Sequence, residues 1–244
     1  MCIIFLSLNS NPQYKFILLA NRDENYHRPS SAATFWSPDI LAGRDLISNG
    51  SWLGITKQGR FAAITNVISS NISPGIQSRG SLVIDFLKSA ISPLDYVTSL
   101  RGKDNYPWYN IIVGDTEQIF IYSNESDQII SLNKSGIYGI GNVGLNKTSP
   151  KLERGKILLA DCTNIEQLFD ILNDRTKCDD KLLPRVLDVE VERAMSTIFV
   201  KSSEFGTRAQ TVILIDYNDK VTFIERSLDD DKWIEKSFNF YFTI

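Results

Sequence analysis

The sequence predicts an α+β fold, with antiparallel sheets and helices packed outside them. Two observations indicate this class. β-Hairpin patterns occur near both ends of the chain, and helical patterns lie in blocks between them. The sequence lacks the regular alternation of single strands and helices that would indicate a doubly wound parallel sheet. No repeat or linker interrupts residues 1–244, so we expect a single domain.

The first third of the chain predicts four strands joined in two hairpins. Residues 2–8 and 16–20 are apolar runs on either side of a turn rich in Asn, Ser and Pro. Residues 52–56 and 61–66 flank a second turn that contains a glycine. Each hairpin would bring the ends of its two strands together.

Helical patterns dominate the middle of the chain. Apolar residues at 82, 83, 86 and 87 form one stripe of a helix expected over residues 81–90. Further helices are expected over residues 94–100, 150–161, 164–173 and 186–197. The remaining strands are expected at residues 111–113, 119–122, 129–130, 137–140, 211–215, 221–224 and 238–242.

Composition describes an ordinary globular protein, with 43% hydrophobic and 23% charged residues. The net charge of −3 argues against nucleic acid as the main partner. No apolar run has the length of a membrane span or of a signal-peptide core, so we expect a cytoplasmic protein. Residues 1–80 hold seven Lys and Arg against four Asp and Glu, which would suit an anionic ligand or simply reflect scattered surface charge.

The cysteines and the single histidine predict no metal site. Cys2, Cys162 and Cys178 are an odd number, and their spacing fits neither a disulfide framework nor structural zinc. His27 stands in a polar loop, where we expect it to be exposed. The carboxylates show no metal-binding spacing either.

Cys2 is the most informative residue for chemistry. If Met1 is removed, Cys2 carries both a thiol and a free α-amine, and it would be a nucleophile with its own base. The alternative is structural, because cysteine is often a small buried hydrophobe and Cys2 begins an apolar strand.

The polar segment Asn21-Arg22-Asp23-Glu24 directly follows the strand expected to pair with the one that begins at Cys2. An arginine near the thiol would favour the thiolate, and a carboxylate could hold a protonated α-amine. On a regular strand Arg22 and Asp23 point to opposite faces, so both reach Cys2 only if the chain bulges or leaves the strand. The alternative is a solvated turn in which Arg22 pairs with a neighbouring acid.

Three further residues are candidates because of their positions. Asn66 ends the second hairpin. Asn142 lies next to a glycine after a strand, where its amide would face a developing oxyanion or simply form a turn. Arg208 precedes the strand at 211–215, where it would clamp an anion or serve as an edge charge.

These residues together resemble the family named for its Asn-Arg-Asp-Glu signature, that of transport and Golgi organization protein two. The likeness covers nearly the full length. The matching segments are Met1-Cys2, Asn21-Arg22-Asp23-Glu24, Arg28-Pro29, Gly50-Ser51-Trp52-Leu53-Gly54, Asn66-Val67, Ser78-Arg79-Gly80, Gly141-Asn142, Gly206-Thr207-Arg208, Thr211-Val212 and Phe223-Ile224-Glu225-Arg226. The family resembles N-terminal-nucleophile hydrolases, which implies an αββα sandwich of two antiparallel sheets between helix layers.

The resemblance also implies site roles, by analogy with penicillin V acylases and bile salt hydrolases. Cys2 matches the nucleophile, and Asn142 the oxyanion-hole asparagine. Asn66 matches an asparagine whose backbone lines that hole, and Arg208 matches the late arginine of the site.

Two other matches are looser. Arg22 and Asp23 correspond to an early arginine and aspartate that are separated in those acylases but adjacent here. The family further implies haem trafficking and the binding of acyl-coenzyme A through Asn21, Arg22, Asp23 and Glu24, with Arg28 nearby. A role in secretion belongs to its eukaryotic members.

Two hypotheses follow from the residues and the resemblance. The first is binding and trafficking of an amphiphilic anion, haem or acyl-coenzyme A, in a cleft near Cys2, with haem as cargo and no cofactor required. The second is a hydrolase in which Cys2 attacks an amide or an acyl thioester. We favour the first, and the second remains the alternative.

Overall fold

The computed structural model describes residues 2–36, 39–68, 75–145, 147–162, 164–183, 185 and 188–243. Backbone contacts divide the chain into two compact units, and each is described by itself. The first unit comprises Met1–His27, Ser135–Ile140 and Lys147–Asn239. The second comprises Arg28–Lys134, Gly141–Asn146 and Phe240–Ile244.

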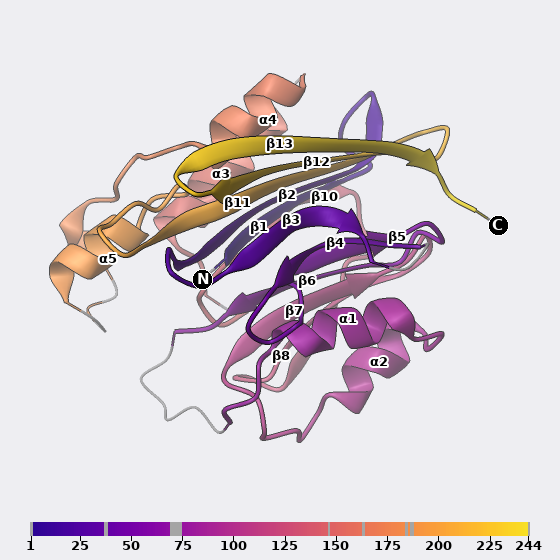
Figure 1. Ribbon diagram of the computed structural model, residues 1–244, viewed down its shortest axis with the longest axis horizontal. Coiled ribbons are helices and arrows are strands. Elements are labelled where there is room, and N and C mark those ends of the chain that lie inside the picture. The colour runs from indigo at the N-terminus through magenta and orange to yellow at the C-terminus, as the bar shows by residue number, and fades with distance from the viewer. Residues whose placement is uncertain are drawn as a thin grey trace. The chain divides into compact units, whose positions relative to one another are not determined.

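The first unit is built on a six-stranded sheet with the order β10-β1-β2-β11-β12-β13. Its strands are β1 (Cys2–Leu8), β2 (Tyr14–Asn25), β10 (Gly136–Ile140), β11 (Phe205–Asp216), β12 (Lys220–Asp229) and β13 (Lys232–Tyr241). Its helices are α3 (Pro150–Ala160), α4 (Ile165–Leu172), the 3-10 turn η1 (Asp180–Leu182) and α5 (Val189–Met195). Helix α3 packs on β1 and β10, and α4 packs on β2 and β11 (Figure 1).

Small and apolar residues allow α3 and α4 to pack closely on the six-stranded sheet. A side chain at Gly155 would overlap the ring of Phe5, so the missing Cβ lets α3 lie directly on β1. Helix α4 begins at Asn164, whose side chain accepts a hydrogen bond from the Gln167 N–H. The face of α4 that includes Phe169 is buried, and this burial holds the helix in place.

The second unit is built on a seven-stranded sheet with the order β3-β4-β5-β6-β7-β8-β9. Its strands are β3 (Ser30–Phe35), β4 (Ile40–Asp45), β5 (Leu53–Thr56), β6 (Phe61–Asn66), β7 (Tyr109–Gly114), β8 (Ile119–Ser123) and β9 (Gln128–Ser131). Helices α1 (Gly80–Lys88) and α2 (Pro93–Ser99) pack on this sheet.

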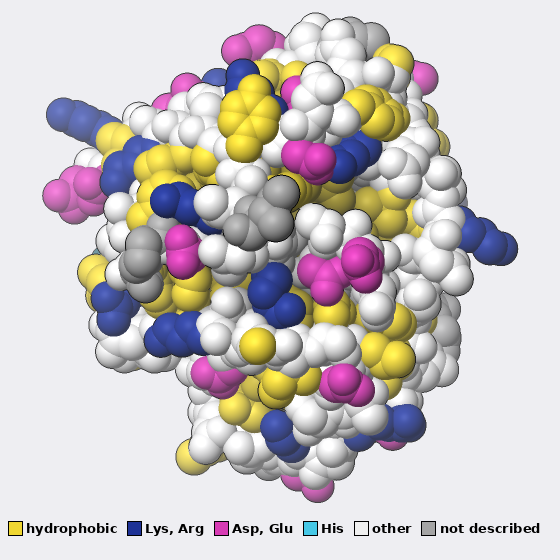
Figure 2. Space-filling model, turned by 90° about the vertical axis from the view of Figure 1, so that its right-hand side faces the viewer, with side chains coloured by type: hydrophobic (Ala, Val, Ile, Leu, Met, Phe, Trp, Pro, Cys, Tyr) yellow, Lys and Arg dark blue, Asp and Glu magenta, His cyan; other side chains and the backbone are white. Residues whose placement is uncertain are grey.

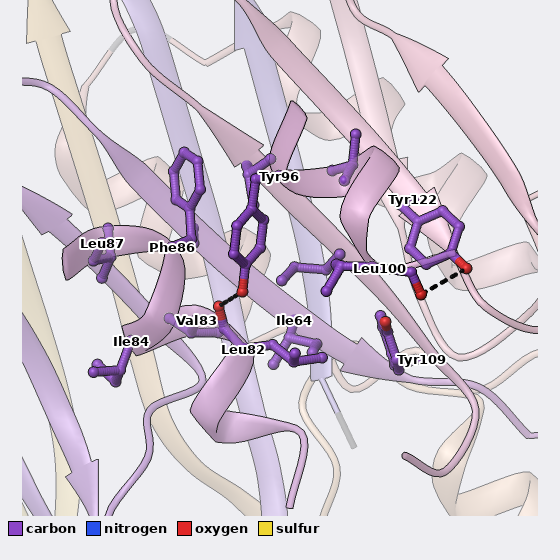
Figure 3. Close-up of a cluster of buried hydrophobic side chains, with 14 of the residues drawn as sticks. Ile64, Leu82, Val83, Ile84, Phe86, Leu87, Tyr96, Leu100, Tyr109 and Tyr122 are labelled. Carbon is purple, nitrogen blue, oxygen red and sulfur yellow. Dashed lines mark hydrogen bonds between the residues drawn. The ribbon is translucent and has the colours of Figure 1, made fainter. Parts of the chain in front are cut away.

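An apolar cluster fills the space between these two helices and their sheet (Figure 3). Phe86 of α1 is fully buried and lies edge-on to Tyr96 of α2, with the ring centroids 5.1 Å apart. The Tyr96 hydroxyl donates a hydrogen bond of 2.6 Å to the carbonyl of Leu82, and this bond ties α2 to α1. The Tyr122 hydroxyl of β8 likewise donates to the carbonyl of Leu100, which follows α2, at 3.5 Å (Figure 3).

Two of the motif segments noted in the sequence meet in the second unit. A side chain at Gly50 would overlap the backbone of Gly80, and the Ser51 N–H donates to the Gly80 carbonyl at 3.1 Å. The Arg79 guanidinium donates to the carbonyl of Trp108 at 3.0 Å. Both segments therefore serve to start helix α1 at the right place on the sheet.

The predicted α+β class with two antiparallel sheets is confirmed, and the single domain stays a prediction. Strands β3 and β4 were not expected from the sequence. Strand β13 begins six residues before the predicted 238–242. It is an edge strand whose charged residues face solvent, and this removes the apolar alternation that would reveal it.

Two further properties concern the length of the helices and the distribution of surface charge. In the part of the chain that the structure describes, no helix is both long and apolar enough to cross a membrane. On the face in Figure 2, basic, acidic and apolar side chains are interspersed, and no single sign of charge dominates.

Candidate functional site

Cys2 begins β1 and lies directly opposite Arg22 of β2 in the antiparallel register. Paired residues share a face of the sheet, so thiol and guanidinium project to the same side. The thiol is partly accessible, but the packing around it raises its pKa, and Arg22 opposes that rise. A thiol in this environment is neutral at pH 7 and needs a base before it can attack.

The polar segment that follows the first hairpin is part of the strand, not a turn. β2 continues to Asn25, and Arg22 and Asp23 are 5% and 1% exposed. The solvated turn considered above is therefore wrong. The strand carries these groups because neighbouring elements supply partners for them.

A bulge in β11 brings Arg208 close to Arg22 and Glu24 of β2. Thr207 pairs with Asp23 and Ala209 with Arg22, so Arg208 is the extra residue between the two pairs. Its guanidinium makes long hydrogen bonds of 3.5 Å to the carbonyls of Asn25 and Leu228. The bulge therefore lies in β11, and not in β2, where it would have been needed for both Arg22 and Asp23 to reach Cys2.

Two guanidinium groups, those of Arg22 and Arg208, lie on this face together with carboxylates. Arg22 lies 3.9 Å from the carboxylate of Glu24. Burial lowers the pKa of Arg208, and the positive charge of Arg22 lowers it further, while Glu24 and Asp229 raise it. The two positive charges beside Cys2 are therefore offset in part by nearby carboxylates.

Asn21 and Asp23 point to the other face of the sheet, which α3 and α4 cover. The Asn21 amide donates to the carbonyls of Leu172 and Ile198 at 2.8 and 2.9 Å. Asp23 accepts a hydrogen bond of 2.7 Å from the Thr207 hydroxyl. Burial raises the pKa of Asp23, and this hydrogen bond opposes the rise. Asn21 is thus bonded to the helix layer, and only Arg22 and Glu24 share the face of Cys2.

Asn66 and Asn142 lie in the second unit and contact each other. The Asn142 amide donates to the backbone carbonyl of Asn66 at 3.0 Å and to its side-chain oxygen at 2.9 Å. The Ile68 N–H donates to the Asn142 carbonyl at 2.8 Å. Their oxyanion roles remain predictions of the resemblance.

Arg28 belongs to the second unit and forms an ion pair with Asp45. Its Nε and Nη2 donate to the two carboxylate oxygens at 2.6 and 3.0 Å. His27 is exposed, as expected. Met1, on which the free α-amine depends, lies outside the described residues.

Gly206, one of the matching residues, and Lys151, which was not singled out from the sequence, both lie near the site. Gly206 has no side chain because one would overlap the hydroxyl of Tyr26. Lys151 is buried at the start of α3, and its ammonium donates to the Met195 carbonyl at 2.9 Å. The helix dipole disfavours a lysine in the first turn of a helix, and this unusual position was the feature of the sequence that could have identified Lys151.

Among the residues with described positions, no group of three or more His, Cys, Asp and Glu side chains is placed to hold a metal ion. All three cysteines are free thiols.

Comparison with known proteins gives one family and one fold. Residues 1–230 match the sequence model of the family Transport and Golgi organisation 2. The chain is 32% identical to a Transport and Golgi organization protein 2 homolog from Bos taurus, with 96% of each chain covered. It is 26% identical to Transport and Golgi organization protein 2 from Drosophila melanogaster, with 93% of this chain and 92% of that protein covered.

Solved structures with little sequence identity share the fold. The C2A mutant of a conjugated bile acid hydrolase from Clostridium perfringens matches with a TM-score of 0.60 at 8% identity, over 100% of this chain and 97% of that one. An N-acylethanolamine-hydrolyzing acid amidase ortholog from Caenorhabditis elegans matches with a TM-score of 0.54 at 11% identity, over 87% and 92%. The chain therefore has the N-terminal-nucleophile hydrolase-like fold implied by the resemblance.

Proposed function

The chain belongs to the Transport and Golgi organisation 2 family, and we propose that it binds an anionic amphiphile, acyl-coenzyme A or haem, beside Cys2. The observation that carries the proposal is the pair of buried guanidinium groups, Arg22 and Arg208, on the face of Cys2. Binding requires no processing of the amino terminus, whereas hydrolysis does.

The energetic argument concerns like charges. Two guanidinium groups that are each less than a tenth exposed repel each other across a medium less polar than water. Glu24 and Asp229 offset part of this repulsion, and a ligand carboxylate or phosphate near the pair would offset more of it. Such an anion would bind with charge-assisted hydrogen bonds.

The side chains that could bind haem iron are few, and this favours acyl-coenzyme A over haem. The single histidine, His27, is exposed, and the internal methionine, Met195, is the last residue of α5. Haem iron usually takes a histidine, cysteine, methionine or tyrosine ligand. Cys2 is the soft ligand on the face of Arg22, so haem would depend on Cys2, on His27 or on a tyrosine. Three free thiols also suit a reducing compartment, so we propose the cytoplasm as the site of action.

Titration calorimetry with palmitoyl-coenzyme A and with haemin tests this proposal. Arg22→Gln and Arg208→Gln should each weaken palmitoyl-coenzyme A binding by about tenfold or more, because each removes a charged donor. Arg226→Gln is the matched control, since that arginine pairs with Glu235 at the surface. The proposal fails if the wild-type protein binds neither compound at micromolar concentration, or if all three variants bind equally well.

A second function is favoured by the register of Cys2 with Arg22 in this fold. The related bile acid hydrolase structure carries its mutation at a second-position cysteine as well. If Met1 is removed, the α-amine would take the thiol proton and the sulfur would attack an acyl carbon. The leaving group would depart with that proton, and water would then release the acid from the acyl-enzyme. Glutamate and arginine side chains near Cys2 would orient the substrate.

Intact mass of the purified protein tests the second function first. The mechanism requires loss of Met1 and a mass increase when an activated acyl ester reacts with the protein. Cys2→Ala should abolish that increase, and Cys162→Ser should leave it unchanged, because Cys162 is a buried thiol at the end of α3. A protein that retains Met1 lacks the base and cannot use this mechanism.

A further inference from the structure

Lys151 is a buried lysine at a position that disfavours a cation. It is the second residue of α3, after Pro150, where the helix dipole places partial positive charge. Its side chain is nevertheless only 9% exposed. A buried ammonium group requires an acceptor or a negative charge nearby.

The backbone around Lys151 leads directly to the end of β2. Its Nζ donates to the carbonyl of Met195 at 2.9 Å. The segment that follows, residues 196–200, accepts a hydrogen bond from Asn21 of β2 and exchanges two with Thr207 of β11. The lysine and the buried polar end of the sheet thus meet at the same short segment.

Three titratable groups from different segments act electrostatically on Lys151. They are Asp23 of β2, Cys2 of β1 and Cys178 of the segment before η1, with Asp23 the strongest. Burial lowers the pKa of Lys151, and Asp23 opposes that change. Burial raises the pKa of Asp23, and the positive charge of the amino terminus opposes that change most, followed by Lys151, Thr207 and Arg22. Lys151 and Asp23 therefore each stabilise the charged form of the other.

We propose that Lys151 is a positioning residue of the site, whose ammonium group supplies one of the counter-charges that hold Asp23 at the end of β2. The role is assigned to the same site as the proposed function, and it requires no particular ligand. An ionised Asp23 in turn raises the pKa of the Cys2 thiol. Lys151 would thus act on Cys2 through Asp23, from the helix-covered face of the sheet.

The test is a carbon-13 NMR titration of the Asp23 carboxyl group in protein labelled at aspartate, with the signal assigned by its loss in Asp23→Asn. In Lys151→Met the titration midpoint should rise by about one pH unit or more, because the nearby positive charge is gone. Lys151→Arg should stay close to wild type. Lys156→Met is the matched control, since this lysine of the same helix pairs with Glu153 at the surface. A purely structural lysine would leave the midpoint unchanged, and that result overturns the proposal.

Folding of the variants gives an independent test. Removal of one partner of a buried charge pair leaves the other uncompensated, so the urea midpoint should fall in Lys151→Met and in Asp23→Asn. In the double variant it should fall less than the sum of the two decreases. If Lys151→Met does not fold, recovery of folding in the double variant supports the pair, and failure of the double variant as well overturns it.

Neither measurement uses a ligand, so the two proposals fail separately. Absence of palmitoyl-coenzyme A binding by the wild-type protein would remove the proposed function and leave the Asp23 titration to decide the role of Lys151. If the wild-type protein binds palmitoyl-coenzyme A, loss of binding in Arg208→Gln would support the proposed binding site. An unchanged Asp23 midpoint in Lys151→Met would then show that Lys151 is not part of that site.

Discussion

Two buried aspartates, one in each unit, have pKa values shifted in opposite directions. Asp45 of the second unit is 6% exposed, and Asp23 of the first is 1% exposed. Burial raises the pKa of both, but at Asp45 the hydrogen bonds from Arg28 and Ser48 outweigh burial and lower the pKa to about 2. At Asp23 burial prevails over the amino terminus, Lys151 and Thr207, and the pKa is raised.

The difference separates a structural carboxylate from one suited to chemistry. Asp45 anchors the turn between β4 and Gly50 and is fully served by donors, so it is ionised at every physiological pH. The charge of an ionised Asp23, close to Cys2, is offset only in part by the groups around it. Perturbed carboxyl groups of this second kind are concentrated at functional sites.

The largest effect is expected for removal of the structural carboxylate. Asp45→Ala should lower the free energy of unfolding by about 3 kcal/mol, because it leaves Arg28 without its partner and frees the turn. Urea unfolding followed by circular dichroism measures this. Asp127→Ala is the control, since its pair with Arg101 is about half exposed and should contribute little. Equal costs in the two variants would show that Asp45 has no special structural role.

The second prediction concerns acid. The folded pKa of Asp45 is below its usual value of about 3.9, so its contribution is complete above pH 4 and is lost as the pH falls toward 2. Arg28→Gln should therefore cost about 1–2 kcal/mol at pH 6 and almost nothing at pH 2. Urea unfolding of both proteins across this range measures the difference. A deficit that stays constant with pH would contradict the assignment of the shift to Arg28.

The fold was predictable from the sequence where apolar and polar residues alternate clearly. The first hairpin was predicted because residues 2–8 and 16–20 are apolar and a turn separates them. Strand β3 was missed because Ser30, Ser31 and Thr34 give it little apolar character. Strand β4 was missed because its apolar run is limited to Ile40, Leu41 and Ala42, after which Gly43, Arg44 and Asp45 follow.

The geometry around Cys2 was predictable only in part. The hairpin predicted that the strand of Cys2 pairs with the strand of Arg22, and the alternation of side chains predicted that Arg22 and Asp23 point to opposite faces of a regular strand. The bulge at Arg208 and the approach of Lys151 were not predictable, because both depend on contacts between segments more than 100 residues apart. Local patterns contain no information on such contacts.

The third prediction concerns the hydroxyl donor to Asp23. Thr207→Val removes a hydrogen bond of 2.7 Å to the carboxylate and should lower the free energy of unfolding by about 1 kcal/mol at pH 7. Because the folded pKa of Asp23 is already raised, the ionised form is the unfavourable one, and the deficit should shrink as the pH falls below that pKa. The pH range in which this deficit shrinks lies above the range in which the deficit of Arg28→Gln disappears. A deficit that disappears only between pH 4 and pH 2 would mean that Asp23 resembles Asp45.

The smallest effect is expected for the corresponding hydroxyl donor to Asp45. The Ser48 hydroxyl donates to the Asp45 carboxylate at 3.0 Å, and Ser48→Ala removes this bond. Four donor contacts remain, two from Arg28 and one each from the N–H groups of Ile47 and Ser48. The cost should therefore be about 0.5 kcal/mol, below that of Thr207→Val. Urea unfolding of both variants at pH 7 makes the comparison directly, and equal losses would mean that the two carboxylates are equally well supplied with donors.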